Sequence, residues 1–183
     1  MELEKLREPF EESDIEWRVQ RSDLNSRGEP WALVVPYIDS RAIMDRLDEA
    51  CGLENWQNRF DRGPDGGVIC GISIRVSGEW ITKWDGAEVP DTSEEEGERK
   101  NRLDPVKTSL TNAFKRAAVQ WGIGRYLYGQ EPVFAVFREQ GRYAARIRGK
   151  TFRWDPPMPG ENRRESRNTS ASGKRANPSS RQV

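Results

Sequence analysis

The sequence predicts an α+β domain in which antiparallel strands are followed by a long helix packed across them, with a disordered C-terminal tail. Apolar side chains alternate along Val68–Val76, which is typical of a half-buried strand. Apolar residues recur at helical spacing over residues 106–121, which predicts the long helix. Residues 155–183 hold four Pro and five Ser but only four apolar residues, too few to offset the entropy lost on ordering.

The N-terminal part is predicted to form a short helix and a hairpin. Leu3, Leu6 and Phe10 stand at helical spacing, which predicts an amphipathic helix at the start of the chain. Alternation over residues 15–19 and an apolar run over 31–37 indicate two strands. A polar loop that contains glycine separates them, so we expect the two strands to pair.

A second helix is predicted directly after this hairpin. The side chain of Asp39 or Ser40 can accept a hydrogen bond from the first turn, and Gly52 stands where a glycine commonly ends a helix. The apolar residues between them share one face and are expected in the core: Ile43, Met44, Leu47, Ala50 and Cys51.

The next segments predict a run of strands over residues 56–60, 68–76 and 79–85. Ser77-Gly78 marks a tight turn between the last two. The segment 85–98 then contains seven acidic residues and no basic one, which is typical of a solvated loop. With 30 basic and 30 acidic residues in total, the rest of the chain carries a net charge of +7, so overall neutrality does not exclude a polyanionic partner.

The long helix is predicted to begin with Asp104 as its N-cap and Pro105 at its first position, and to end at Gly122 and Gly124. Its expected core stripe consists of Val106, Leu110, Ala113, Phe114, Ala117 and Trp121. A last hairpin is predicted from residues 133–137 and 142–148 around Gln140-Gly141. The folded domain is therefore expected to span residues 1–154, and the disordered, weakly basic tail residues 155–183.

Composition excludes several function classes. The chain has no histidine, which excludes Ser-His-Asp and Cys-His nucleophilic chemistry and His-ligated zinc. Cys51 and Cys70 are the only cysteines and form no C-x-x-C motif, so we expect a reducing compartment. No apolar run is long enough to span a membrane, and the charged N-terminus does not resemble a signal peptide.

Basic residues on two helices are candidate phosphate contacts. Lys115 and Arg116 are adjacent on the long helix, with Lys107 about two turns earlier. Arg41 lies in the second helix, where it can instead pair with Asp45 at i+4. From spacing alone, an ordinary solvated helix face explains these charges more simply than a binding site.

Aromatic residues offer a second candidate, because the chain contains seven Trp. Exposed aromatic rings among basic residues can stack on bases. Large aromatic side chains also fill cores and subunit interfaces, and we favour this interpretation for Trp56, Trp80, Trp84 and Trp121.

A nuclease is the alternative function. Asp91, Glu98 and Lys100 follow the P-D…E-x-K pattern in which two carboxylates hold Mg²⁺ and a lysine helps to activate water. Those groups must be held rigidly at strand ends. The residues between them have loop composition, which speaks against this interpretation.

Three ordered segments resemble the Rad52/Rad22 family of single-strand annealing proteins, most closely its bacterial and phage DdrA-like members. The resemblance covers roughly residues 10–130. Its segments are YIDSRAIMDRLDE followed by NWQ, WITKWDGAE, and NAFKRAAVQWGIGRYLY.

The resemblance implies a β-β-β-α core, a ring or open multimer, and ATP-independent binding and annealing of single-stranded DNA in recombination and double-strand-break repair. It places phosphate contacts at Arg41, Lys115 and Arg116. To these we add Lys107 and Lys83 as weaker candidates. A further basic residue expected one turn after the Lys-Arg pair is Val119 here. We expect no counterpart of the partner-binding C-terminal region of eukaryotic relatives.

The predicted protein is therefore a DNA-binding module and not an enzyme, with no cofactor and no metal. Its expected partners are single-stranded DNA and further copies of the chain, because the edge strands of the early hairpin and of Val68–Val76 need partners. No membrane contact is expected. The expected location is the cytoplasm of a bacterial or phage-infected cell, in association with the nucleoid.

Overall fold

The computed structural model describes residues 2–63, 66–88 and 105–157, and confirms the α+β class. The chain divides into two compact units. The first comprises Met1–Arg18 and Val35–Glu131, and the second comprises Val19–Val34 and Pro132–Val183. The division falls within the strands β1 (Ile15–Leu24) and β2 (Pro30–Ile38), which form the predicted hairpin.

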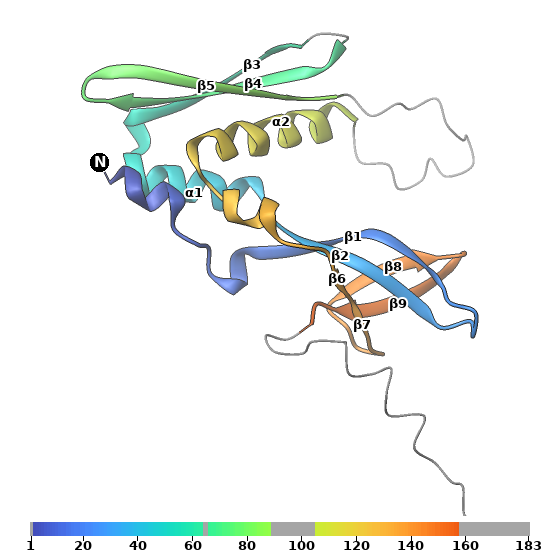
Figure 1. The fold of residues 1–183 in the computed structure, drawn as a ribbon. Helices are drawn as coiled ribbons and strands as arrows, with labels where there is room; N and C mark the ends of the chain where they lie inside the picture. Colours follow the sequence, from blue (N-terminus) through green and yellow to red (C-terminus); the bar gives the residue numbers. More distant parts are fainter. Residues whose placement is uncertain (1, 64–65, 89–104, 158–183) are drawn as a thin grey trace, which may run out of the picture. The chain divides into compact units, whose positions relative to one another are not determined.

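The first unit is built on an antiparallel sheet of β3 (Trp56–Arg62), β4 (Val68–Val76) and β5 (Glu79–Ala87), in the order β3-β4-β5. The helices α1 (Ser40–Cys51) and α2 (Pro105–Trp121) lie on one side of this sheet (Figure 1). This arrangement is the expected β-β-β-α core. The strand β4 is central, so the expectation that it is an edge strand is wrong, and the edges are β3 and β5.

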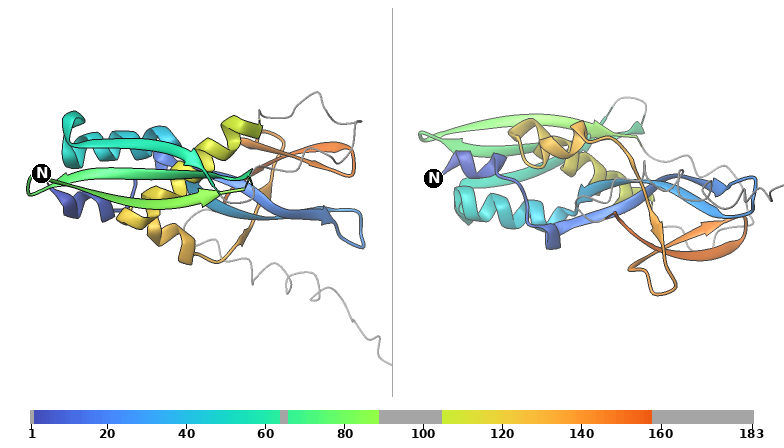
Figure 2. Two further views of the ribbon diagram at one scale, coloured as in Figure 1. Left: turned by 90° about the horizontal axis from the view of Figure 1, so that it is seen from above. Right: turned by 60° about the horizontal axis from the view of Figure 1, so that its bottom comes forward.

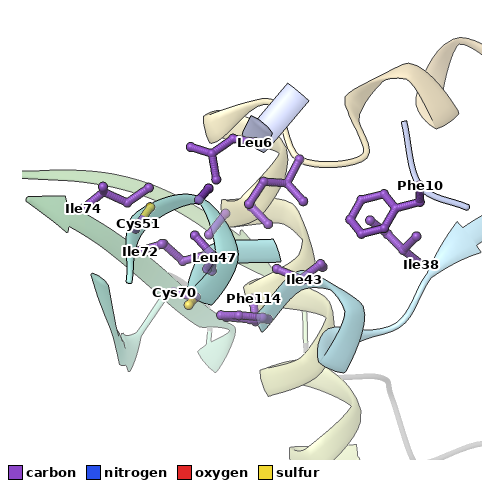
Figure 3. Close-up of a cluster of buried hydrophobic side chains, with 14 of the residues drawn as sticks. Leu6, Phe10, Ile38, Ile43, Leu47, Cys51, Cys70, Ile72, Ile74 and Phe114 are labelled. Carbon is purple, nitrogen blue, oxygen red and sulfur yellow. The ribbon is translucent and has the colours of Figure 1, made fainter. Parts of the chain in front are cut away.

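The core of the first unit forms between the sheet and the two helices (Figure 3). The predicted alternation of β4 is confirmed, because Cys70, Ile72 and Ile74 are fully buried. They pack with apolar residues of both helices and of the N-terminal segment, including Leu6, Phe10, Ile43, Leu47, Ala113, Phe114 and Ala117.

The helix α1 begins as predicted. Asp39 Oδ1 accepts hydrogen bonds from the backbone N of Arg41 and of Ala42, each at 2.9 Å, and the helix ends before Gly52. Met44, predicted in the core, is exposed instead. It follows Ile43 directly and is therefore turned by about 100° from that buried position, outside the stripe that faces the sheet.

Two further predictions about helices are wrong in detail. The N-terminal segment forms the 3₁₀ turns η1 (Leu3–Arg7) and η2 (Glu12–Asp14) in place of one α-helix, since Pro9 interrupts it. Leu6 and Phe10 are nevertheless buried as expected. The core stripe of α2 begins later than predicted, because Val106 is exposed while Ser109 and Ala113 are buried. Asp104, the predicted N-cap, lies outside the described residues.

The second unit contains a sheet of β7 (Val136–Phe137), β9 (Lys150–Asp155) and β8 (Tyr143–Ile147), in that order. The short strand β6 (Val133–Phe134) pairs with β2. The predicted hairpin of 133–137 with 142–148 is therefore wrong: β8 pairs with β9 through a turn at Arg148-Gly149. Trp154 of β9 is buried and stacks on Tyr143 of β8, with ring centroids 4.7 Å apart. This contact stabilises the pairing of β9 with β8.

The predicted tail begins inside this sheet, since Asp155 is the last residue of β9. The rest of the tail, from residue 158, lies outside the described residues, as do residues 89–104 of the acidic segment. Asp85, at the start of that segment, is the last residue of the predicted strand 79–85 and belongs to β5. No helix among the described residues is long and apolar enough to cross a membrane.

Candidate nucleic-acid interface

Lys115 occupies a half-buried position where α2 meets the end of β2. Its Nζ lies 4.6 Å from the centroid of the Tyr37 ring, within cation–π range. Burial lowers the pKa of Lys115, while the charge of Asp39 opposes that shift. Burial also raises the pKa of Tyr37, together with the charges of Glu16 and Asp39. The ammonium group is thus fixed on an aromatic face close to the start of α1.

Arg116 points to a different neighbour. Its Nε donates to Asp85 Oδ1 at 2.9 Å, and 53% of its side chain remains exposed. Asp85 also accepts hydrogen bonds from Gln120 Nε2 at 3.0 Å and from the backbone N of Gly86 at 2.7 Å. Burial alone would raise the pKa of Asp85, but these hydrogen bonds together hold it below its ordinary value.

The Lys-Arg pair is therefore divided between two sides of α2. Successive helical residues are about 100° apart, so Lys115 turns to β2 and Arg116 turns to β5. Lys83 is on the Arg116 side, where its Nζ donates to the backbone O of Gln120 at 3.0 Å and lies 4.4 Å from the Trp121 ring centroid. Together with Arg125, which donates to the backbone O of Val119 and Gln120, Lys83 caps the C-terminus of α2.

The remaining predicted contacts are exposed. Arg41 stands in the first turn of α1, and within the described residues its guanidinium forms no ion pair with Asp45. It lies two residues after Asp39, whose charge acts on Lys115. Lys107 is exposed in the first turn of α2, about 12 Å along the helix from Lys115. The structure thus brings α1 and Lys115 together and leaves Lys107 at the other end of α2.

Sequence analysis missed Arg18, an exposed residue of β1. Its positive charge adds to the lowering of the pKa of Lys115 by burial and opposes the rise in the pKa of Tyr37, so it lies within electrostatic reach of both groups. The alternation of residues 15–19 places Arg18 on the polar face of its strand. Only the fold shows that this face adjoins α2.

The alternative nuclease site gains no support. Asp91, Glu98 and Lys100 lie outside the described residues. In the part of the chain that the structure describes, no three His, Cys, Asp or Glu side chains gather as a metal site would require. Burial raises the pKa of the Cys70 thiol to about 11, which makes this thiol a poor nucleophile.

Comparisons with known proteins agree with the resemblance noted in the sequence. A family model described as Rad52/22 family double-strand break repair protein matches residues 2–142. The chain is 29% identical over 124 residues to a protein of Deinococcus radiodurans named single-stranded DNA-binding protein DdrA, covering 68% of this chain and 53% of the relative. It is 31% identical over 124 residues to the DdrA of Deinococcus deserti, covering 68% and 55%.

The chain thus spans about half the length of the curated relatives that it matches. The match to the family model covers most of this chain, because residues 2–142 include the early hairpin, the β3-β4-β5 sheet and α2. Since it covers well over half of the chain, the chain belongs to the Rad52/22 family of double-strand break repair proteins.

Proposed function

We propose that this protein binds single-stranded DNA and anneals complementary strands, without ATP, in recombination and double-strand-break repair. The observation that carries the proposal is the arrangement of Lys115 and Arg116 on α2, in a chain that matches the Rad52/22 family over residues 2–142. The relatives named single-stranded DNA-binding protein support the choice of ligand.

The arrangement suits this activity because phosphate contacts hold a strand without reading its bases. Arg41, Lys115 and Arg116 are the proposed principal contacts, with Arg18 added by the structure and Lys107 and Lys83 as weaker contacts. Bases left free can test for a complement, and pairing itself supplies the free energy of annealing. The proposed activity therefore needs no catalytic group, cofactor or metal.

We also propose that the protein acts as a homo-oligomer. The strands β3 and β5 are the edges of their sheet, and unpaired strand edges favour pairing between chains. A multimer aligns many weak phosphate sites along one strand, so avidity raises the overall affinity. Its proposed location is the cytoplasm, where it would reach DNA of the nucleoid.

Replacing Lys115 and Arg116 together by Ala tests the site. Each phosphate contact to a single strand contributes about −0.7 to the slope of log K against log salt, so the slope should flatten by roughly 1.4 per engaged subunit. Binding to all sequences should weaken alike, and annealing of dye-labelled complementary oligonucleotides should slow. The measurement is a salt titration of binding to mixed-sequence and homopolymer strands, with circular dichroism to check folding.

The matched control replaces the exposed Arg146 and Lys150 by Ala, which removes the same charge from the β8-β9 hairpin. This control should bind and anneal nearly as wild type. If the α2 variant stays folded yet keeps the wild-type slope and annealing rate, the DNA-binding site lies elsewhere. Shortening of labelled DNA by wild type with Mg²⁺, lost in Asp91→Ala, would instead favour the nuclease.

A further inference from the structure

The outer face of the β3-β4-β5 sheet carries two exposed tryptophans. Trp80 and Trp84 are each 45% exposed, so they do not lie in the core, and the alternative expectation of a subunit interface stays a prediction. Both stand on the side of β5 opposite to Lys83, which points to α2. In Figures 1 and 2, α1 and α2 lie on the other side of this sheet, and no described element of the first unit covers its outer face.

Trp84 is held flat against the sheet. It stands opposite Gly71 of β4, and a Cβ on Gly71 would lie only 2.7 Å from the indole ring. The glycine therefore provides the space in which the ring lies, and the ring buries Gly71. One ring face is seated on backbone, and the other is directed away from the sheet. Such a ring loses little freedom when a planar ligand stacks on it.

Polar and basic side chains surround the two rings. Across the sheet, Arg59 stands opposite Gly71 in the same row as Trp84, and Arg75 stands opposite Trp80. Both arginines are exposed. Between the two rows, Ser73 Oγ and Thr82 Oγ1 are 2.8 Å apart and hydrogen-bonded. Positions 80 and 84 are about 13 Å apart along β5, so the two rings form separate stacking positions. Arg75 is the direct cross-strand neighbour of Trp80, whereas Arg59 stands two strands from Trp84 and forms an ion pair with Asp61 at 3.6 Å.

We infer that this outer face is a second binding surface for single-stranded nucleic acid, which stacks unpaired bases on Trp80 and Trp84 and places phosphates near Arg59 and Arg75. The inference rests on the proposed function for the ligand class, and it adds a site on the opposite side of the sheet from α2. Exposed aromatic faces flanked by cations fit unpaired bases, whereas a duplex hides its base faces.

A second copy of the chain is the rival occupant. Two copies of the chain can instead pair through the edges of this sheet. Within the described residues, its edge strands β3 and β5 present unpaired backbone groups. The face itself interrupts its apolar rings with two arginines and a hydroxyl pair, unlike the continuous apolar surface of an obligate interface. These features favour nucleic acid.

The two surfaces differ in what they need from the ligand, which gives the test. Phosphate contacts at α2 persist with an abasic oligonucleotide, whereas stacking requires bases. Wild type should bind oligo(dT) more tightly than an abasic oligonucleotide of equal length. In Trp80→Ala/Trp84→Ala the affinity for oligo(dT) should fall roughly five- to 150-fold per stacked base, and the preference should disappear. Trp80→Phe/Trp84→Phe should keep most of it.

Tyr128→Ala is the matched control, since Tyr128 is an exposed aromatic residue away from this face. It should keep the wild-type preference. If the double Ala variant, folded by circular dichroism, retains the preference for bases, the inference is wrong while the proposed function stands. If its sedimentation shows smaller assemblies, the face is an interface between copies. If wild type binds neither oligonucleotide, the proposed function fails as well.

Discussion

Arg116 donates to Asp85 at 2.9 Å, so a phosphate that binds this guanidinium must share or displace the carboxylate. Asp85 thus acts on the proposed site as a competing anion. It also ties β5 to α2, because it accepts hydrogen bonds from both Arg116 and Gln120. The same side chain is expected to weaken DNA binding and to support the fold.

Asp85→Asn separates these two roles. It removes the charge that competes with phosphate, so affinity for single-stranded DNA should rise and the salt slope should steepen by up to about 0.7.

The pKa of Asp85 is lowered in the folded protein, so its contribution to stability is present above its ordinary pKa of 3.8 and is lost as pH falls through the folded value. Thermal unfolding should therefore show wild type more stable than the variant at pH 7, with a smaller difference at pH 3. Equal differences at both pH values, or weaker DNA binding by the variant, would contradict this assignment.

Individual side chains were predictable where a local motif fixes them. The sequence predicts Asp39 or Ser40 as the N-cap of α1, because capping depends only on neighbouring residues, and the structure selects Asp39. The sequence predicts Asp85 at the end of the strand 79–85 but does not predict its partners, because these stand 31 and 35 residues later in the chain. Arg18 was missed for the same reason, since its proximity to Lys115 depends on tertiary structure.

At the scale of the element, α1 positions Arg41 and brings Asp39 close to Lys115. Asp39→Ala removes both hydrogen bonds to the first turn and should destabilise the protein by about 0.5–2 kcal/mol. Asp45→Ala is the matched control, because Asp45 is exposed within the same helix and caps nothing. Denaturant unfolding measures both free energies. Equal effects would show that the cap contributes no more than an exposed charge.

The elements that sequence analysis predicted well are those with a strict period. The alternation of β4 and the stripe of α2 reflect one buried face each, so the sequence pattern contains the information. The last hairpin was wrong because two turn signals compete there. Gln140-Gly141 does not join paired strands, because Gly141 lies against the backbone of Trp154 and β8 pairs with β9. The sequence predicts Trp154 only as the end of the domain and so does not reveal this pairing.

At the scale of the whole molecule, the strand β9 extends one residue past Trp154, the predicted end of the folded domain. Asp155 accepts a hydrogen bond from the backbone N of Arg142 at 2.8 Å, and Trp154 is only 1% exposed. The strand β9 is central in the β7-β9-β8 sheet. A truncation that tests the proposed tail must therefore leave β9 intact.

Removing residues 158–183 should leave the fold and the assembly unchanged, because this segment offers few apolar side chains to a core. It carries six basic and two acidic residues, so DNA affinity should fall modestly at low salt and hardly at high salt. Sedimentation should show the same species for both proteins, each larger than the 21.0 kDa of one full-length chain.

Removing residues 150–183 is the matched comparison. It deletes β9 and with it the partner of both β7 and β8, so the second unit should unfold and the melting temperature should drop. An equally large drop after removal of 158–183 alone would show that this segment contributes to the folded structure, and monomers of the untruncated chain at micromolar concentration would remove the proposed assembly.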